Sequence, residues 1–161
     1  MKALLLFLLR LYVGLYMAYY SLPKIKRPSD FLKNIRLYEM VPENPPWLLN
    51  GMAVWIPWME LLAGLFLVLG IARRGAATLL TFLLVIFSAA ILWRTLGIFQ
   101  AQDIAFCDIA FDCGCGTGEV IICHKLPINF SLILAAAWIA CSQDRSWSLT
   151  SKFSRRRNET E

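Results

Sequence analysis

Hydrophobic residues occur in four long runs, which polar and proline-rich segments separate. Each run is close to the roughly 20 residues that a helix needs to cross a bilayer. A shorter segment follows the first run, in which Phe31, Ile35 and Tyr38 share one helical face and charged residues lie off it. The pattern predicts an all-α membrane four-helix bundle over residues 1–142, with a short amphipathic helix at the membrane surface. The expected spans are residues 3–22, 47–72, 76–93 and 127–141.

The composition supports this prediction. The chain has 161 residues, of which 58% are hydrophobic and 17% charged, and its mean hydropathy of +0.58 exceeds that of ordinary soluble domains. Four spans leave no room for a separate soluble catalytic domain. The net charge of +5 is typical of contact with anionic lipid, and we expect the lipid bilayer as a partner and no nucleic acid.

Charge also predicts the orientation in the membrane. Four spans place both termini and the Arg73–Arg74 turn on one side, together with a basic tail at residues 143–161. The first loop on the other side is mixed, but the cysteine loop there is acidic. The positive-inside rule therefore favours a multi-pass protein of the inner (cytoplasmic) membrane, with cytoplasmic termini and a periplasmic cysteine loop. The periplasm is oxidising and allows disulfides.

The loop at residues 107–123 holds four of the five cysteines. Cys113 and Cys115 are separated by one glycine, and a disulfide across one residue closes a strained ring that is easily reduced, which suits electron exchange. Cys107 and Cys123 bracket this pair and can form a second disulfide that relays electrons. Four cysteines permit 3 connectivities, and the sequence does not choose among them.

Two other interpretations of the loop stay open. Two disulfides can simply tie down an extracytoplasmic loop. The same four thiols with His124 can also bind a soft metal, but their spacing matches no familiar zinc pattern, so we assign no metal site. Cys141 lies alone near the end of the last span, where we expect a small buried packing residue.

Arg10 and Glu60 are charged residues inside predicted spans. Counted from the cytoplasmic ends at about 1.5 Å per residue, they lie at depths of about 10 and 16 Å, a difference that an arginine side chain can bridge. We therefore expect a buried pair, either at a quinone or proton site or as a clamp between helices. Trp55 and Trp58 flank Pro57 and either line a flat apolar pocket there or belong to the interfacial aromatic belt.

Three groups of residues resemble the DoxX-like superfamily of four-helix membrane proteins, within it the branch of the methylamine-utilisation protein MauE. The first is the Arg10 helix, which ends in Ser21, Pro23 and Lys24 where the family has a Ser-Gly-x-x-Lys-like turn, with Leu22 replacing the glycine. The second is the Pro-Trp-x-Glu helix, here Pro57 to Glu60, followed by Gly64 and Gly70. The third is the Cys-Gly-Cys loop that precedes Asn129 and the last helix, here with Gly116-Thr117-Gly118 where the branch often has an aromatic residue.

The resemblance implies periplasmic thiol redox chemistry, or maturation of disulfide-containing partners. We expect a thiol-disulfide oxidoreductase that exchanges electrons through Cys113 and Cys115 with a periplasmic thioredoxin-like or disulfide-containing protein. A quinone is the candidate cofactor, near Arg10, Trp58 and Glu60. The alternative function is a non-catalytic subunit or assembly factor of a larger membrane redox complex, with a structural disulfide loop.

Overall fold

The computed structural model describes residues 2–42, 44–102, 105–112 and 118–142. It contains the helices α1 (Lys2–Lys26), α2 (Pro28–Leu37), α3 (Pro46–Leu69), α4 (Arg73–Gln102) and α5 (Ile122–Cys141). A short 3-10 helix, η1 (Phe106–Asp108), and the strands β1 (Ala110–Asp112) and β2 (Glu119–Ile121) lie between α4 and α5. Within the described residues, four helices are long and apolar enough to cross a membrane: α1, α3, α4 and α5. The predicted all-α membrane bundle is confirmed.

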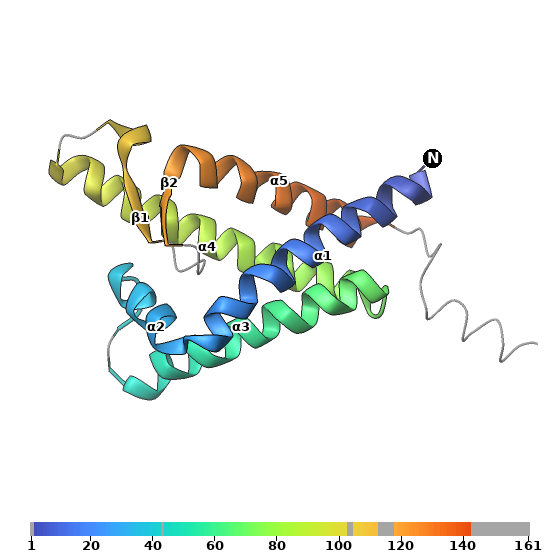
Figure 1. Cartoon of the computed structure of the whole chain (residues 1–161), viewed down its shortest axis with the longest axis horizontal. Coiled ribbons are helices and arrows are strands. Elements are labelled where there is room, and N and C mark those ends of the chain that lie inside the picture. The colour runs from blue at the N-terminus through green and yellow to red at the C-terminus, as the bar shows by residue number, and fades with distance from the viewer. Residues whose placement is uncertain (1, 43, 103–104, 113–117, 143–161) are drawn as a thin grey trace, which may run out of the picture.

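The helices pack as two closely associated pairs, α1 with α3 and α4 with α5 (Figure 1). The strands form a small antiparallel hairpin in which Phe111 is opposite Val120. This hairpin lies at the end of the bundle where α1 ends and α5 begins, far from the N-terminus (Figure 1). We call this end the hairpin end.

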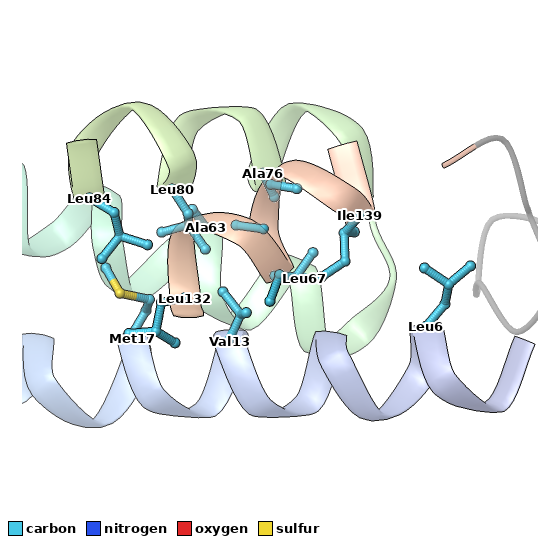
Figure 2. Packing of buried hydrophobic residues seen from close by; sticks show 13 residues of the cluster. Leu6, Val13, Met17, Ala63, Leu67, Ala76, Leu80, Leu84, Leu132 and Ile139 are labelled. Atoms are coloured by element: carbon cyan, nitrogen blue, oxygen red, sulfur yellow. The ribbon is translucent and has the colours of Figure 1, made fainter. Parts of the chain in front are cut away.

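The main hydrophobic core lies between the four long helices, and each helix contributes to it. Figure 2 labels ten of its buried members, which come from all four helices: Leu6, Val13, Met17, Ala63, Leu67, Ala76, Leu80, Leu84, Leu132 and Ile139. Gly14 allows α1 to approach α3 closely, because a Cβ at Gly14 would lie 2.7 Å from the carbonyl oxygen of Gly64. Small residues at such a crossing let the backbones of membrane helices meet.

The amphipathic helix is confirmed as α2, which begins at Pro28, a residue favoured in the first helical turn. Its buried face carries Phe31 and Ile35, which pack against Leu49 and Ala53 of α3. The α2 helix therefore covers the hairpin end of α3.

Three helix boundaries differ from those expected at the hairpin end. Pro23 does not end α1, which continues to Lys26, and α4 continues past Arg94 to Gln102. The last helix begins at Ile122, so Pro127 lies inside it rather than in its first turn. Proline is tolerated within membrane helices because neighbouring groups satisfy the freed backbone. These extensions bring residues expected in loops into the bundle.

Candidate functional site at the hairpin end

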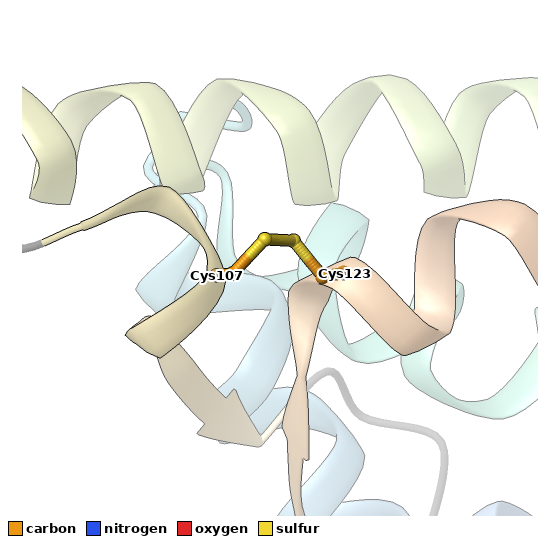
Figure 3. Close-up of a disulfide and its surroundings, with 2 residues drawn as sticks. All are labelled: Cys107 and Cys123. Atoms are coloured by element: carbon orange, nitrogen blue, oxygen red, sulfur yellow. A yellow bond between two sulfur atoms is a disulfide. The ribbon is translucent and has the colours of Figure 1, made fainter.

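A disulfide between Cys107 and Cys123 connects η1 to the first turn of α5 (Figure 3). The two Cα atoms lie 5.1 Å apart, and the bond joins positions 16 residues apart. It confirms that the outer two cysteines of the loop can pair with each other. The base of the hairpin is therefore covalently held to the last membrane helix.

The inner cysteines, Cys113 and Cys115, lie outside the described residues. Asp112 ends β1 just before them, and Gly118, with a left-handed φ of 80°, precedes β2. The strand register that pairs Asp112 with Glu119 fixes both ends of the segment that contains the two thiols.

The soft-metal interpretation loses two of its ligands in this state, since Cys107 and Cys123 are bonded to each other. His124 is exposed at the start of α5. Within the described ranges, no group of three or more histidine, cysteine or acidic side chains is placed to hold a metal ion. Cys141 is exposed and has a free thiol, so the expectation of a buried packing residue there was wrong.

The hairpin packs on the bundle through an apolar cluster centred on Ile91, Ile109 and Ile122, with Tyr38 from the end of α2. The ring of Tyr38 meets that of Phe111 edge to face, with centroids 6.4 Å apart. Burial raises the pKa of Tyr38, and the negative charge of Asp112 raises it further. Tyr38 therefore stays neutral at any physiological pH.

A buried ion pair lies beneath the hairpin. Lys24 Nζ is 3.1 Å from Oε1 and 2.8 Å from Oε2 of Glu60, and the two side chains are 8% and 1% exposed. The same ammonium lies over the rings of Phe31 and Phe87, at 5.2 and 4.8 Å from their centroids. Lys24 can reach Glu60 because α1 continues through Pro23.

The expected pairing of Arg10 with Glu60 was wrong. Arg10 instead donates from Nε to the carbonyl oxygen of Leu67 (3.0 Å) and from Nη2 to that of Val68 (3.2 Å). These carbonyls belong to the last turn of α3, roughly 10 Å along the helix from Glu60. Arginine is favourable there because its positive charge faces the negative end of the α3 dipole and its N–H groups donate to carbonyls of the last turn, of which that of Leu67 also accepts from the backbone N–H of Gly70.

Trp58 does not share a site with Glu60 either. It is 46% exposed on the outer surface of α3, and Trp55 is 68% exposed there, whereas Pro57 and Glu60 are buried in the bundle. The position of Trp58 fits the alternative of residues that contact lipid, and neither tryptophan lines the cavity that contains Glu60 among the described residues.

A small cavity lies beside the ion pair and has residues that the sequence analysis did not select. Its volume is about 40 Å³, and its polar lining comprises Tyr16, Tyr20, Lys24, Glu60, Lys125 and Asn129. Lys125 lies in the first turns of α5, where we had expected a loop, and is 8% exposed. The signal available in the sequence was the presence of charged residues directly beside apolar runs.

A quinone does not fit this cavity. Sites for molecules of that size have volumes of about 300 Å³ or more, and the cavity has about 40 Å³. Arg10, Trp58 and Glu60, expected to bind the quinone together, point to three different surroundings. Quinone coupling stays a prediction.

Comparisons with known proteins give the context for this geometry. The family model described as methylamine utilisation protein MauE matches residues 2–142. The chain belongs to the MauE family. It is 32% identical, over 136 residues, to the methylamine utilization protein MauE of Methylorubrum extorquens, an alignment that covers 81% of this chain and 67% of the relative. No solved structure matches the chain.

For this MauE-family chain, the matched region contains each helix that the structure describes, the disulfide and the buried ion pair. The match ends at residue 142, which is also the last residue that the structure describes. The family assignment therefore applies to the hairpin end as a whole.

Proposed function

We propose that this chain is a membrane thiol-disulfide exchange protein that acts in methylamine utilisation and supports the maturation of a disulfide-containing partner. Cys113 and Cys115 are the exchanging pair. The partner, thioredoxin-like or itself the protein that matures, meets them at the hairpin end of the bundle.

The Cys107–Cys123 disulfide is the observation that carries this proposal. Of the 3 ways to pair four cysteines, it leaves only the bond between Cys113 and Cys115. Cys141 is no alternative partner, because it lies about 27 Å along α5 from Cys123. A bond across a single glycine is strained and readily exchanged.

The exchange is balanced in two steps. A partner thiolate attacks the Cys113–Cys115 disulfide, which forms a mixed disulfide and releases one loop thiolate. The second partner thiol then displaces the loop cysteine, so that the partner gains a disulfide while two electrons and two protons pass to Cys113 and Cys115. The reverse sequence reduces a partner disulfide. In this reverse direction, Cys107 and Cys123 as a dithiol pass two electrons to the Cys113–Cys115 disulfide by the same exchange, which forms the outer disulfide as the inner one breaks.

The disulfide also supports the proposed orientation. Disulfides persist on the oxidising side of a membrane, so the hairpin end faces the periplasm and both termini face the cytoplasm. Arg73 and Arg74, at the opposite end of the bundle, agree with the positive-inside rule.

The experiment is disulfide mapping followed by trapping. Mass spectrometry of the native, alkylated protein should find a Cys107–Cys123 bond and a Cys113–Cys115 bond. In a glutathione redox series, Cys113 and Cys115 should be reduced at a less reducing potential than the outer pair. Cys115→Ser should accumulate a mixed disulfide through Cys113, and the matched control Cys141→Ser should not. Long-range bonds from Cys113 or Cys115 to the outer cysteines would contradict the proposal.

The second candidate function is a non-catalytic assembly factor within a larger membrane redox complex. The packing of the hairpin on Tyr38 and Ile122 favours it, because a hairpin held by a disulfide and an apolar cluster presents a fixed surface. On this alternative, Cys113→Ser combined with Cys115→Ser lowers the amount of assembled complex. Neither the wild type nor the variant then shows thiol turnover. Native-mass measurement of complexes and a glutathione turnover assay on the same variant separate the two functions.

A further inference from the structure

Lys125 is a buried cation without a matching carboxylate. Its Nζ donates to the hydroxyl of Tyr16 at 3.5 Å and lies 5.2 Å from the ring centroid of Tyr20. Among the described residues, no carboxylate lies within ion-pair distance of it. Glu60 lines the same cavity, but both of its oxygens accept hydrogen bonds from Lys24.

The position of Lys125 in the helix increases its need for a negative charge. It is the fourth residue of α5, where the N-terminal end of the helix dipole is positive. An ammonium has three N–H groups, and a single hydrogen bond of 3.5 Å leaves two of them for a ligand. A buried charge is costly unless it is paired.

The cavity beside Lys125 has room only for a small ligand. Its volume of about 40 Å³ exceeds the roughly 10–15 Å³ that a cavity needs to hold one water molecule. Asn129 also faces it, and Nδ2 of that residue uses one N–H to donate to Ser88 Oγ at 3.2 Å, which leaves the other. Apolar side chains line the rest: Met17, Leu84, Phe87 and Ile91.

Lys24 connects this cavity to an open cleft. It lines both the cavity and a cleft of about 600 Å³ between the α1–α2 junction and the hairpin. Lys26 and Arg27 also line the cleft, are exposed, and form no ion pair with any described residue. Asp30 and Asp112 lie on its walls as well, and Asp30 is paired with Lys33. The exposed cationic groups that line the cleft attract anions from the solvent.

We propose that the cavity lined by Lys125, Tyr16 and Asn129 binds one small inorganic anion of about the size of chloride, which enters through the cleft past Lys24. The anion compensates the charge of Lys125, while Glu60 compensates that of Lys24. This site does not depend on thiol exchange.

Thermal unfolding of the full chain in lipid nanodiscs at neutral pH tests the proposal, with sodium chloride compared with sodium gluconate at equal ionic strength. Gluconate is too large for the cavity. The unfolding temperature should rise with chloride concentration to a plateau, should rise similarly with bromide, and should not rise with gluconate. Chloride-35 NMR of the wild-type protein should show line broadening that bromide reverses by competition.

Lys125→Met is the decisive variant, since methionine keeps most of the side-chain length and removes the charge. It should lose the chloride dependence and should unfold at a higher temperature than wild type in gluconate, because an apolar group replaces an uncompensated buried charge. The matched control Lys33→Met, at an exposed lysine of α2, should keep the full chloride dependence. Equal unfolding temperatures of the wild type in chloride and gluconate would overturn the proposal, as would a chloride response that persists in Lys125→Met. If Lys125→Met does not fold, the chloride-35 NMR of the wild type decides. Line broadening that bromide does not reverse would then overturn the proposal.

Discussion

The ammonium of Lys24 lies 2.8 Å from Oε2 of Glu60, with both side chains almost fully withdrawn from the surface of the bundle. The pair joins the end of α1 to the middle of α3, and the rings of Phe31 and Phe87 cover the ammonium. The bundle therefore contains a neutralised pair of charges close to the hairpin that carries the cysteines.

Breaking this pair should be strongly destabilising. Glu60→Gln leaves the charge of Lys24 buried without compensation, and loss of one partner of such a pair typically costs about 3–5 kcal/mol. Replacing both residues, with Lys24→Met and Glu60→Met, should recover most of that loss. Unfolding in mild detergent, analysed as a double-mutant cycle, measures the coupling.

The exposed pair Lys33 and Asp30 is the control, with an Nζ to Oδ1 distance of 3.5 Å. Its removal should change the free energy of unfolding by less than about 1 kcal/mol. If Glu60→Gln lowers the free energy of unfolding no more than removal of this exposed pair does, Lys24 and Glu60 do not form a buried pair.

The crossing of α1 and α3 predicts a steric effect. A Cβ at Gly64 would lie 2.8 Å from the carbonyl oxygen of Gly14 and 3.2 Å from the backbone nitrogen of Ala18. Gly64→Ala should therefore force the helices apart and cost about 1–3 kcal/mol. Gly97→Ala in α4 meets no atom within 4 Å and should be neutral or slightly stabilising. Thermal unfolding of the two variants in parallel checks this, and equal stability would contradict the close crossing.

Loss of the Cys107–Cys123 bond should loosen the hairpin end selectively. A disulfide that closes a loop of about 15 residues contributes roughly 3 kcal/mol. Cys107→Ser combined with Cys123→Ser should raise hydrogen exchange in β1, β2 and the first turn of α5, with less change near Leu67. The control Cys141→Ser, at the exposed free thiol, should leave exchange unchanged. Unaltered protection of the hairpin in the double variant would show that the bond does not hold it.

Tyr38 predicts an alkaline loss of stability. Burial and Asp112 raise its pKa above the ordinary value of about 10. Above about pH 10 the unfolded state therefore releases the phenolic proton while the folded state keeps it. The contribution of Tyr38 to the free energy of unfolding is complete below about pH 10 and is lost as the pH rises above that value. Unfolding temperatures between pH 8 and about 11 should fall more for wild type than for Tyr38→Phe. Asp112→Asn should lower the pKa of Tyr38 only in part, since burial is the larger cause. Identical pH profiles for wild type and Tyr38→Phe would show that Tyr38 does not cause the alkaline loss of stability.

The sequence by itself determined the four apolar helices, the amphipathic face of α2 and the MauE family motifs, because these depend on composition and periodicity within one segment. It also marked Glu60 as a buried charge and limited the cysteine pairings to three. Periodicity gives the face of a helix but not its register against a neighbour.

The tertiary structure decided which residues meet. Because α1 continues through Pro23, Lys24 enters the bundle and takes the place at Glu60 that we had expected for Arg10, while Arg10 lies at the last turn of α3. Because α5 begins at Ile122, Cys123 reaches Cys107 and Lys125 becomes buried. Both outcomes depend on where helices end and how they cross, which contacts between distant segments fix and local sequence does not.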